Sequence, residues 1–124
     1  MVSCYVTHAT PATFYAKVPK RSKYEDIAVQ LAETDNVNLI IGGGRKHFNH
    51  RKDSLDLIGR MENELGWKVY DTLDGIDTTC KKVAVLAADD HMPHAAERGD
   101  FLPRAVKTAL KTLDNAENGF FLMV

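Results

Sequence analysis

The sequence lacks the features that mark several large classes of protein. No apolar run approaches the roughly 18 residues of a membrane-spanning helix, and no signal segment precedes Val2. The 16 basic and 17 acidic residues give a formal net charge of −1, so the chain has no excess of positive charge that would indicate binding to nucleic acid or an anionic membrane. The two cysteines, Cys4 and Cys80, are too few for a disulfide framework, so we expect a buried strand thiol and a loop thiol. These absences leave the cellular compartment open.

Common catalytic signatures are also lacking. There is no Gly-x-Ser-x-Gly motif, and none of the serines at 3, 22 and 54 has a general base at a recognisable spacing. The triple glycine at 42–44 lacks the Gly-Lys-Ser/Thr of a nucleotide-binding loop and the spacing of a dinucleotide fingerprint. We interpret it as a structural turn after a strand. The sequence therefore identifies no independent active site within the chain.

Two histidine-rich stretches raise the question of a zinc site. His47 and His50 are three residues apart, as are His91 and His94, and the second pair follows two aspartates. Neither stretch has a helical apolar pattern, and Pro93 interrupts the second. We therefore expect solvated loop histidines, with a zinc site as the alternative.

Strand-like and helix-like segments alternate along the 124 residues, a length typical of one domain or part of one. Apolar or β-branched runs predict strands over 2–7, 37–41, 67–70, 83–88 and 119–124. Helices are predicted over 12–18, after a capping box at Ser22 and Glu25, over 54–65, and after Pro103. The predicted inner face of the last helix consists of Leu102, Val106, Leu110 and Leu113. This order predicts an α/β fold with a mostly parallel sheet.

The stretch 6–21 contains the strongest candidate site. A strand-like alternation ends there at His8, Thr10 and Pro11, and Arg21 follows eleven residues after Thr10. A threonine hydroxyl offers a neutral oxygen to a hard cation such as magnesium. An arginine offers a planar fork of donors that matches phosphate oxygens. On the residues alone, a strand–turn–helix with a surface arginine remains the alternative.

Four stretches of the chain resemble segments of the alkaline phosphatases, in the family's order. They are residues 7–21, 40–46, 86–93 and 118–124. The resemblance implies a single partial domain over residues 1–124, with part of the family's three-layer α/β/α fold. Because the chain also stops inside an apolar strand at Val124, we expect an internal segment of a longer protein.

The resemblance implies a metal-dependent phosphomonoesterase as the parent protein. In the family a serine attacks phosphorus, assisted by two zinc ions and one magnesium ion. By resemblance, Arg21 would hold the nonbridging phosphate oxygens and Thr10 would give its hydroxyl to the magnesium site. His8 would lie near the magnesium, with the least defined role of the three. The nucleophilic serine, the zinc ligands and the magnesium-site glutamate would lie outside this chain, so we expect the isolated chain to be inactive.

The resemblance also implies partners and a location. The partners would be a phosphomonoester or inorganic phosphate, the rest of the parent chain and a possible homodimer. The family's location is periplasmic or secreted. Two other functions stay open: a noncatalytic oxyanion receptor built on Thr10 and Arg21, and a structural interaction module. In the latter, the exposed edge of residues 119–124 would pair with a missing segment or another copy.

Overall fold

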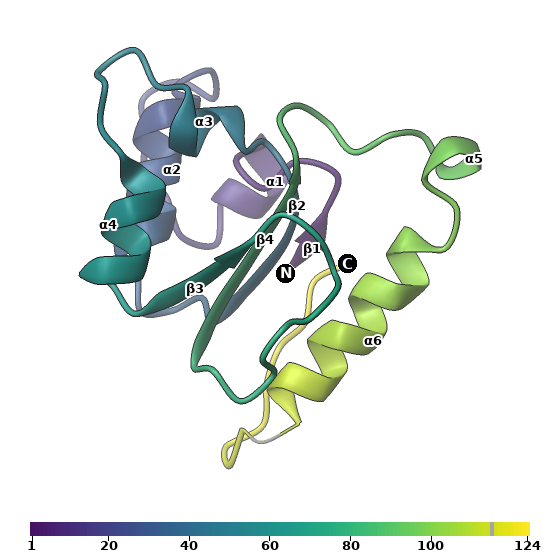
Figure 1. Ribbon diagram of the computed structural model, residues 1–124. Coiled ribbons are helices and arrows are strands. Elements are labelled where there is room, and N and C mark those ends of the chain that lie inside the picture. Colours follow the sequence, from purple (N-terminus) through teal and green to yellow (C-terminus); the bar gives the residue numbers. More distant parts are fainter. Residues whose placement is uncertain (115) are drawn as a thin grey trace.

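The chain folds into one parallel sheet between two layers of helices. The computed structural model describes residues 1–114 and 116–124. The sheet has the order β1-β2-β4-β3, and every neighbouring pair is parallel. Its strands are β1 (Val2–Ser3), β2 (Leu39–Gly43), β3 (Trp67–Tyr70) and β4 (Lys82–Ala88). The predicted α/β/α fold with a parallel sheet is confirmed (Figure 1).

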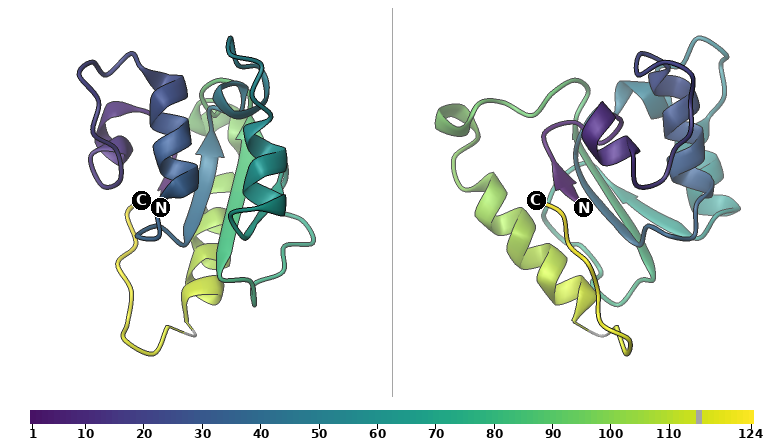
Figure 2. Two further views of the ribbon diagram at one scale, coloured as in Figure 1. Left: turned by 90° about the vertical axis from the view of Figure 1, so that its left-hand side faces the viewer. Right: turned by 180° about the vertical axis from the view of Figure 1, so that it is seen from behind.

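The helices cover both faces of the sheet (Figures 1 and 2). In the described chain they are α1 (Ala9–Ala12), α2 (Tyr24–Glu33), α3 (Lys46–Asn49), α4 (Leu57–Asn63), α5 (Ala95–Arg98) and α6 (Phe101–Leu113). Helices α2, α3 and α4 pack on one face, and α6 packs on the other. None of these helices is both long enough and apolar enough to cross a membrane.

Strands β2 and β4 are apolar on both sides because helices cover both faces. On one face, Ile40 and Leu86 belong to the cluster that contains α2 and α4 side chains. On the other face, Ile41 and Val85 pack in the cluster that contains α6. The edge strand β3 is anchored by Trp67, which is 1% exposed and whose indole N–H donates to the Ala32 carbonyl at 2.9 Å.

The N-terminal elements differ from the prediction. β1 stops at Ser3, so the Cys4 side chain is exposed and the predicted buried strand thiol is wrong. Cys80 is half-buried and both thiols are free. The predicted helix 12–18 is also wrong, since α1 begins at Ala9 and ends at Ala12. Pro11 is tolerated there because a helix needs no N–H donor in its first turn.

The predicted start of α2 is wrong, whereas its predicted inner face is confirmed. The N-cap is Lys23, which makes no side-chain cap, so Ser22 and Glu25 form no capping box. The buried residues are Ile27, Ala28, Leu31 and Ala32, as the periodicity predicts. Helix α4 begins later than predicted because Ser54 has a φ of 59°, outside the helical region. Its N-cap is Asp56, which accepts a hydrogen bond from the Gly59 N–H.

Helix α6 presents a different face from the predicted one. Its fully buried residues are Ala105 and Ala109, while Leu110 is 46% exposed. Leu102 and Leu113 are partly buried at the sides of the contact. Two small alanines let the helix axis approach the sheet closely, so the larger side chains flank the contact instead of filling it.

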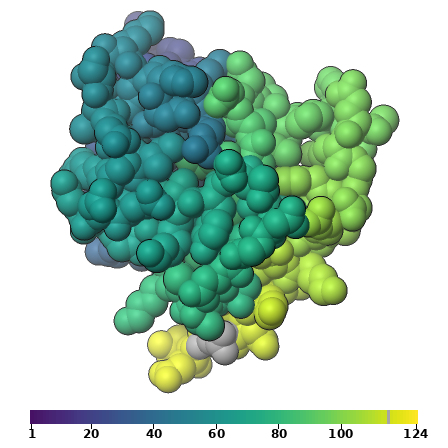
Figure 3. Space-filling view, in the orientation of Figure 1, coloured from purple at the N-terminus to yellow at the C-terminus, as the bar shows by residue number. Residues whose placement is uncertain are grey.

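Residues 119–124 do not form the predicted closing strand. They run as an extended segment beside β1, and the two chain ends lie side by side (Figure 2). One backbone bond joins them, from the Val2 N–H to the Met123 carbonyl at 2.8 Å. In the space-filling view the C-terminal segment lies next to the end of α6 (Figure 3). This segment therefore lacks the ladder of hydrogen bonds that defines a strand.

Candidate functional site

The carboxyl ends of β1, β2 and β4 lie at the same edge of the sheet, which is where ligands bind in α/β proteins. The loops that follow these strands are joined by backbone hydrogen bonds, so their relative positions are fixed by main-chain groups. The bonds run from Val6 N to Gly43 O (3.0 Å), from Met92 N to Cys4 O (2.9 Å), and from Gly44 N to Ala88 O (3.0 Å) and Asp90 O (2.9 Å). We name these three connected loops the loop frame.

Close backbone approaches require that two of the three glycines, Gly42 and Gly43, carry no side chain. A Cβ at Gly42 would lie 2.1 Å from the Ser3 carbonyl oxygen, and one at Gly43 would lie 2.1 Å from the Asp90 carbonyl oxygen. Both glycines continue β2, so the predicted turn is confined to Gly44, whose φ is 101°. The triple glycine therefore serves backbone packing, in agreement with its structural interpretation.

A cluster of tyrosines and histidines lies on the loop frame. Its centre is Tyr5, which is 3% exposed and whose hydroxyl is 2.6 Å from Nε2 of His47. The Tyr5 ring also contacts His91, with ring centroids 4.3 Å apart, and Tyr24, with centroids 5.8 Å apart. Tyr24 stacks on His47 at 5.0 Å. With His8, described below, these residues form the tyrosine–histidine cluster.

An ion pair lies beside the cluster. The Lys46 ammonium donates to both carboxylate oxygens of Asp90 at 2.7 Å, which lowers the pKa of Asp90 and raises the pKa of Lys46. Burial raises the pKa of Tyr5, and the positive charge of Lys46 opposes this shift. Burial lowers the pKa of His47, and the Lys46 charge lowers it further. At neutral pH His47 is therefore uncharged, and its Nε2 can accept the Tyr5 hydroxyl proton in a hydrogen bond.

We expect His47 to make the chain less stable in mild acid. A histidine whose folded pKa is lowered contributes stability that is fully present above its unfolded pKa of about 6.5 and is lost as the pH falls from that value through the lower folded pKa. The groups that act on it are Lys46 and Arg51, which lower its pKa, and Glu25 and Asp90, which raise it. Urea unfolding between pH 5 and 8 should show a smaller acid loss in His47→Gln than in the wild type.

The matched control for this experiment is His50→Gln, because His50 is exposed and next to the same helix. This variant should keep the wild-type pH profile. Parallel profiles for the wild type and His47→Gln would contradict the expectation.

The structure brings only one of the three predicted site residues into the cluster. His8 is the N-cap of α1, and its ring centroid is 6.2 Å from that of Tyr5 and 5.9 Å from that of His91. Thr10 is the second residue of α1, and its side chain is exposed. Arg21 is exposed in the connection between α1 and α2. No ion pair or hydrogen bond within residues 1–114 and 116–124 holds its guanidinium.

Of the four histidines, the expectation is right for His50 and His94, right in part for His91, and wrong for His47. His50 and His94 are exposed, as expected of solvated histidines, and His91 is exposed on one side while it packs on Tyr5. His47 is half-buried on the short helix α3, which the apolar pattern does not predict. One sequence signal could have grouped these residues: Tyr5, His47 and His91 each follow a parallel strand within a few residues.

The described residues do not include a complete set of metal ligands. In the part of the chain that the structure describes, no three His, Cys, Asp or Glu side chains are grouped so that they could hold a metal ion. The exposed Thr10 hydroxyl and the exposed Arg21 guanidinium are nevertheless available to groups supplied from outside this stretch.

Comparison with known proteins identifies the family. The family model for alkaline phosphatase matches residues 1–124. The repressible alkaline phosphatase of Saccharomyces cerevisiae is 33% identical over 159 aligned positions, which cover 100% of this chain and 28% of that protein. The alkaline phosphatase of the Antarctic bacterium TAB5 has a TM-score of 0.86 at 31% identity, covering 98% of this chain and 36% of that one.

A variant of the TAB5 enzyme, in which one histidine is replaced by aspartate, has magnesium bound in its M3 site. It matches this chain with a TM-score of 0.87 at 30% identity, over 98% of this chain and 36% of that one. The chain thus spans between a quarter and two-fifths of the length of these relatives. Because the family model matches every residue, the chain belongs to the alkaline phosphatase family.

Proposed function

We propose that this chain is the part of a metal-dependent phosphomonoesterase that grips the phosphate and contributes to the magnesium site. The observation that supports this most directly is the placement of His8, Thr10 and Arg21. All three follow β1 in the sequence, and His8 lies against Tyr5 at the carboxyl edge of the sheet, in a chain that matches the family over its full length. The proposed reaction is hydrolysis of phosphomonoesters.

In this proposal Arg21 binds the nonbridging oxygens of the phosphate. Its guanidinium is exposed and has no acidic partner among the described residues, so it can turn its donor fork toward a ligand. Two parallel N–H donors fit two phosphate oxygens, and the guanidinium adds a positive charge that attracts them. Lysine at the same position would supply the charge without the fork.

The residues of this chain fit a partial role in magnesium binding. The Thr10 hydroxyl is exposed and is a neutral oxygen, which suits a magnesium ion that keeps several water ligands. His8, two residues earlier, packs edge-on against Tyr5, which fixes its ring close to this position. When bound, magnesium would supply positive charge and ordered water near the nucleophile. Carboxylates from outside this chain would complete that site.

The two zinc ions of the proposed enzyme would also be held from outside this chain. Their contribution would be to stabilise the attacking and leaving oxygens. In this chain, Arg21 would orient the phosphate. Thr10 would provide one oxygen ligand to the magnesium ion.

We expect the isolated chain to show no metal-dependent turnover of a phosphomonoester. The nucleophile and the zinc ligands would come from other parts of the enzyme, so phosphate held by Arg21 would not react. The measurement is p-nitrophenyl phosphate hydrolysis by the pure chain with added zinc and magnesium. Turnover at the rate of an intact enzyme would contradict the proposal.

The role of Arg21 is tested in an intact enzyme. This chain would replace the matching stretch of the TAB5 enzyme, and inhibition by inorganic phosphate would be measured. Arg21→Ala should weaken phosphate binding by about 1.5–3 kcal/mol, the usual worth of a hydrogen bond to a charged group. This energy corresponds to roughly 10- to 150-fold in the inhibition constant.

Two variants control for general effects of charge. Lys20→Ala removes the neighbouring exposed cation and should leave the inhibition constant nearly unchanged. Arg21→Lys should recover part of the loss, because it restores the charge but not the fork. If Arg21→Ala leaves phosphate inhibition unchanged, the assignment of Arg21 is wrong.

A noncatalytic oxyanion receptor is the second candidate. It is supported by the exposed Arg21, which has no acidic partner within residues 1–114 and 116–124, in a chain that has its own apolar core. Phosphate binding by the isolated chain that is lost in Arg21→Ala, without turnover in the replacement enzyme, would favour this function.

A further inference from the structure

A hydrogen bond from a tyrosine hydroxyl closes the segment that contains His8 and Thr10. The Tyr15 hydroxyl donates to the Val6 carbonyl oxygen at 2.6 Å, across nine positions of the sequence. Val6 is 0% exposed, and within residues 1–114 and 116–124 no other group donates to its carbonyl. A buried carbonyl without a donor is unfavourable, so the Tyr15 hydroxyl stabilises this arrangement. We name residues 6–15 the clamped segment.

Val6 joins the clamped segment to the sheet. Its N–H donates to the Gly43 carbonyl of β2 at 3.0 Å, and its own carbonyl accepts the Tyr15 hydroxyl. The other hydrogen bonds of residues 8–16 in the described chain join groups no more than four positions apart. Such local bonds shape α1, but they do not determine where α1 lies relative to the sheet. The Tyr15 hydroxyl is therefore the hydrogen-bonding group that holds the far end of this segment against the end of β1.

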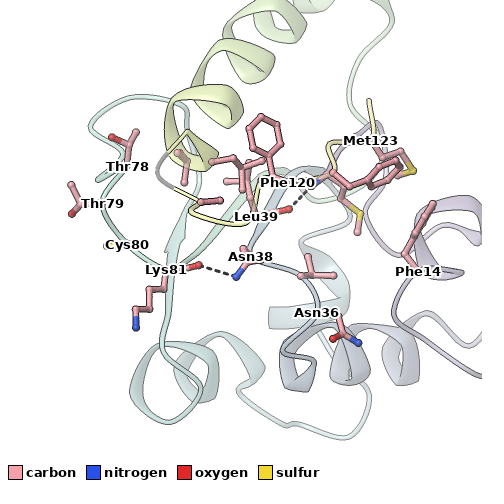
Figure 4. Close-up of a pocket in the computed structure, with 17 residues that line it drawn as sticks. Phe14, Asn36, Asn38, Leu39, Thr78, Thr79, Cys80, Lys81, Phe120 and Met123 are labelled. Carbon is pink, nitrogen blue, oxygen red and sulfur yellow. Dashed lines mark hydrogen bonds between the residues drawn. The ribbon is translucent and has the colours of Figure 1, made fainter.

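The two aromatic residues that follow α1 have different surroundings. Phe14 is 52% exposed and lines a groove of about 570 Å³ together with Leu39 and Met123 (Figure 4). Tyr15 is half-buried and packs against the core cluster that contains the α2 and α4 side chains. Burial raises the pKa of Tyr15. Its hydroxyl therefore remains a donor at alkaline pH, where an exposed tyrosine with a pKa of about 10 would ionise.

We propose that Tyr15 is a positioning residue that holds the Thr10 hydroxyl where it can bind magnesium. The inference rests on the proposed function, in which Thr10 provides one oxygen ligand. Thr10 lies in the middle of the clamped segment, four residues after Val6 and five before Tyr15. Magnesium demands a near-ideal octahedral arrangement of its ligands, so a ligand on a loosely held turn binds it poorly. The Tyr15 hydroxyl orders this turn before the ion binds.

The direct effect of the hydroxyl is measured on this chain by amide hydrogen exchange. Tyr15→Phe keeps the ring and removes only the hydroxyl. The amides of Ala12 and Thr13 should then exchange about fivefold faster or more, because the Val6 carbonyl loses its donor. The control is Tyr70→Phe on β3, which removes a hydroxyl that accepts from the Asp77 N–H at 3.1 Å. It should leave both amides at the wild-type rate. Unchanged exchange in Tyr15→Phe would overturn the proposal.

The consequence for the ion is measured in an intact enzyme, in which this chain replaces the matching stretch of the TAB5 enzyme. Calorimetric titration with magnesium, after its removal, gives the dissociation constant without turnover. Tyr15→Phe should raise this constant by about 10- to 100-fold, the usual effect of losing a group that orients a metal ligand. Tyr70→Phe should change it by less than about twofold. At saturating magnesium, inhibition by inorganic phosphate should stay within about twofold in Tyr15→Phe, because Arg21 lies outside the clamped segment.

Thr10→Val separates a failure of this inference from a failure of the proposed function. This variant removes the hydroxyl ligand and should weaken magnesium binding at least as much as Tyr15→Phe. The double variant should bind magnesium no more weakly than Thr10→Val alone, because Tyr15 acts through Thr10. Additive losses, or a loss in Thr10→Val without one in Tyr15→Phe, would overturn the role of Tyr15 and leave the proposed function standing. If Thr10→Val keeps the wild-type magnesium affinity, both are wrong.

Discussion

Gly43→Ala is expected to lower the free energy of unfolding by about 3 kcal/mol or more, because the new methyl group has no room. Its Cβ would lie 2.1 Å from the Asp90 carbonyl oxygen and 3.0 Å from both Cys4 O and Met92 N. All three neighbours are backbone atoms of the loop frame, so no side chain can rotate away. The loops after β1 and β4 would have to separate. Urea unfolding of the isolated chain measures the effect.

Gly75→Ala is the matched control. Gly75 has a φ of 70°, and a Cβ there would have no heavy atom within 4 Å. Only backbone strain applies, which amounts to about 1–2 kcal/mol for a residue forced into the left-handed region. Equal losses in the two variants would show that the close approach at Gly43 relaxes without cost, and the role given to this glycine would be wrong.

Arg51→Ala is expected to lower the free energy of unfolding by about 3 kcal/mol, from the loss of two charged hydrogen bonds at the low end of their usual range. The Arg51 side chain is 2% exposed, and it donates to the carbonyls of Glu25 at 2.9 Å and His47 at 3.0 Å. It also pairs with Asp53, which lowers the pKa of that carboxyl. Without the guanidinium, α2 and the end of α3 lose their common donor.

The consequence should extend to the cluster, because His47 is one of the residues that Arg51 holds. Loss of the Arg51 contact should broaden the NMR signals of the His47 ring and weaken its 2.6 Å contact with the Tyr5 hydroxyl. Lys52→Ala removes an exposed neighbouring cation and should leave both the stability and these signals unchanged. A stable Arg51→Ala chain with wild-type His47 signals would refute this account.

The fold could be predicted from the sequence to the extent that it depends on local pattern. The apolar runs of β2 and β4 predict strands covered on both faces, and both strands are central. The period of Ile27, Ala28 and Leu31 predicts the inner face of α2. These patterns can be read from the sequence because the position of a residue within its own helix or strand determines whether it is buried.

The parts that the sequence does not predict depend on partners far apart in the chain. The contact of α6 depends on Ala105 and Ala109, whose small size matters only opposite a sheet. Residues 119–124 have a strand-like composition, but without a ladder they remain a segment with one backbone bond. The cluster joins Tyr5, His47 and His91 from three loops, and no single stretch contains the pattern.

The loop frame has a consequence for how this family can diverge. Its three loops are joined by main-chain N–H and C=O groups, which almost any amino acid supplies, so the exposed side chains on the loops are free to change during evolution. The glycines at the close approaches are constrained by shape, and Tyr5, Val6 and Thr7 are constrained by burial. Exposed side chains on these loops could therefore change by single substitutions on an unchanged scaffold. A TM-score of 0.86 at only 31% identity is the outcome expected of such an architecture.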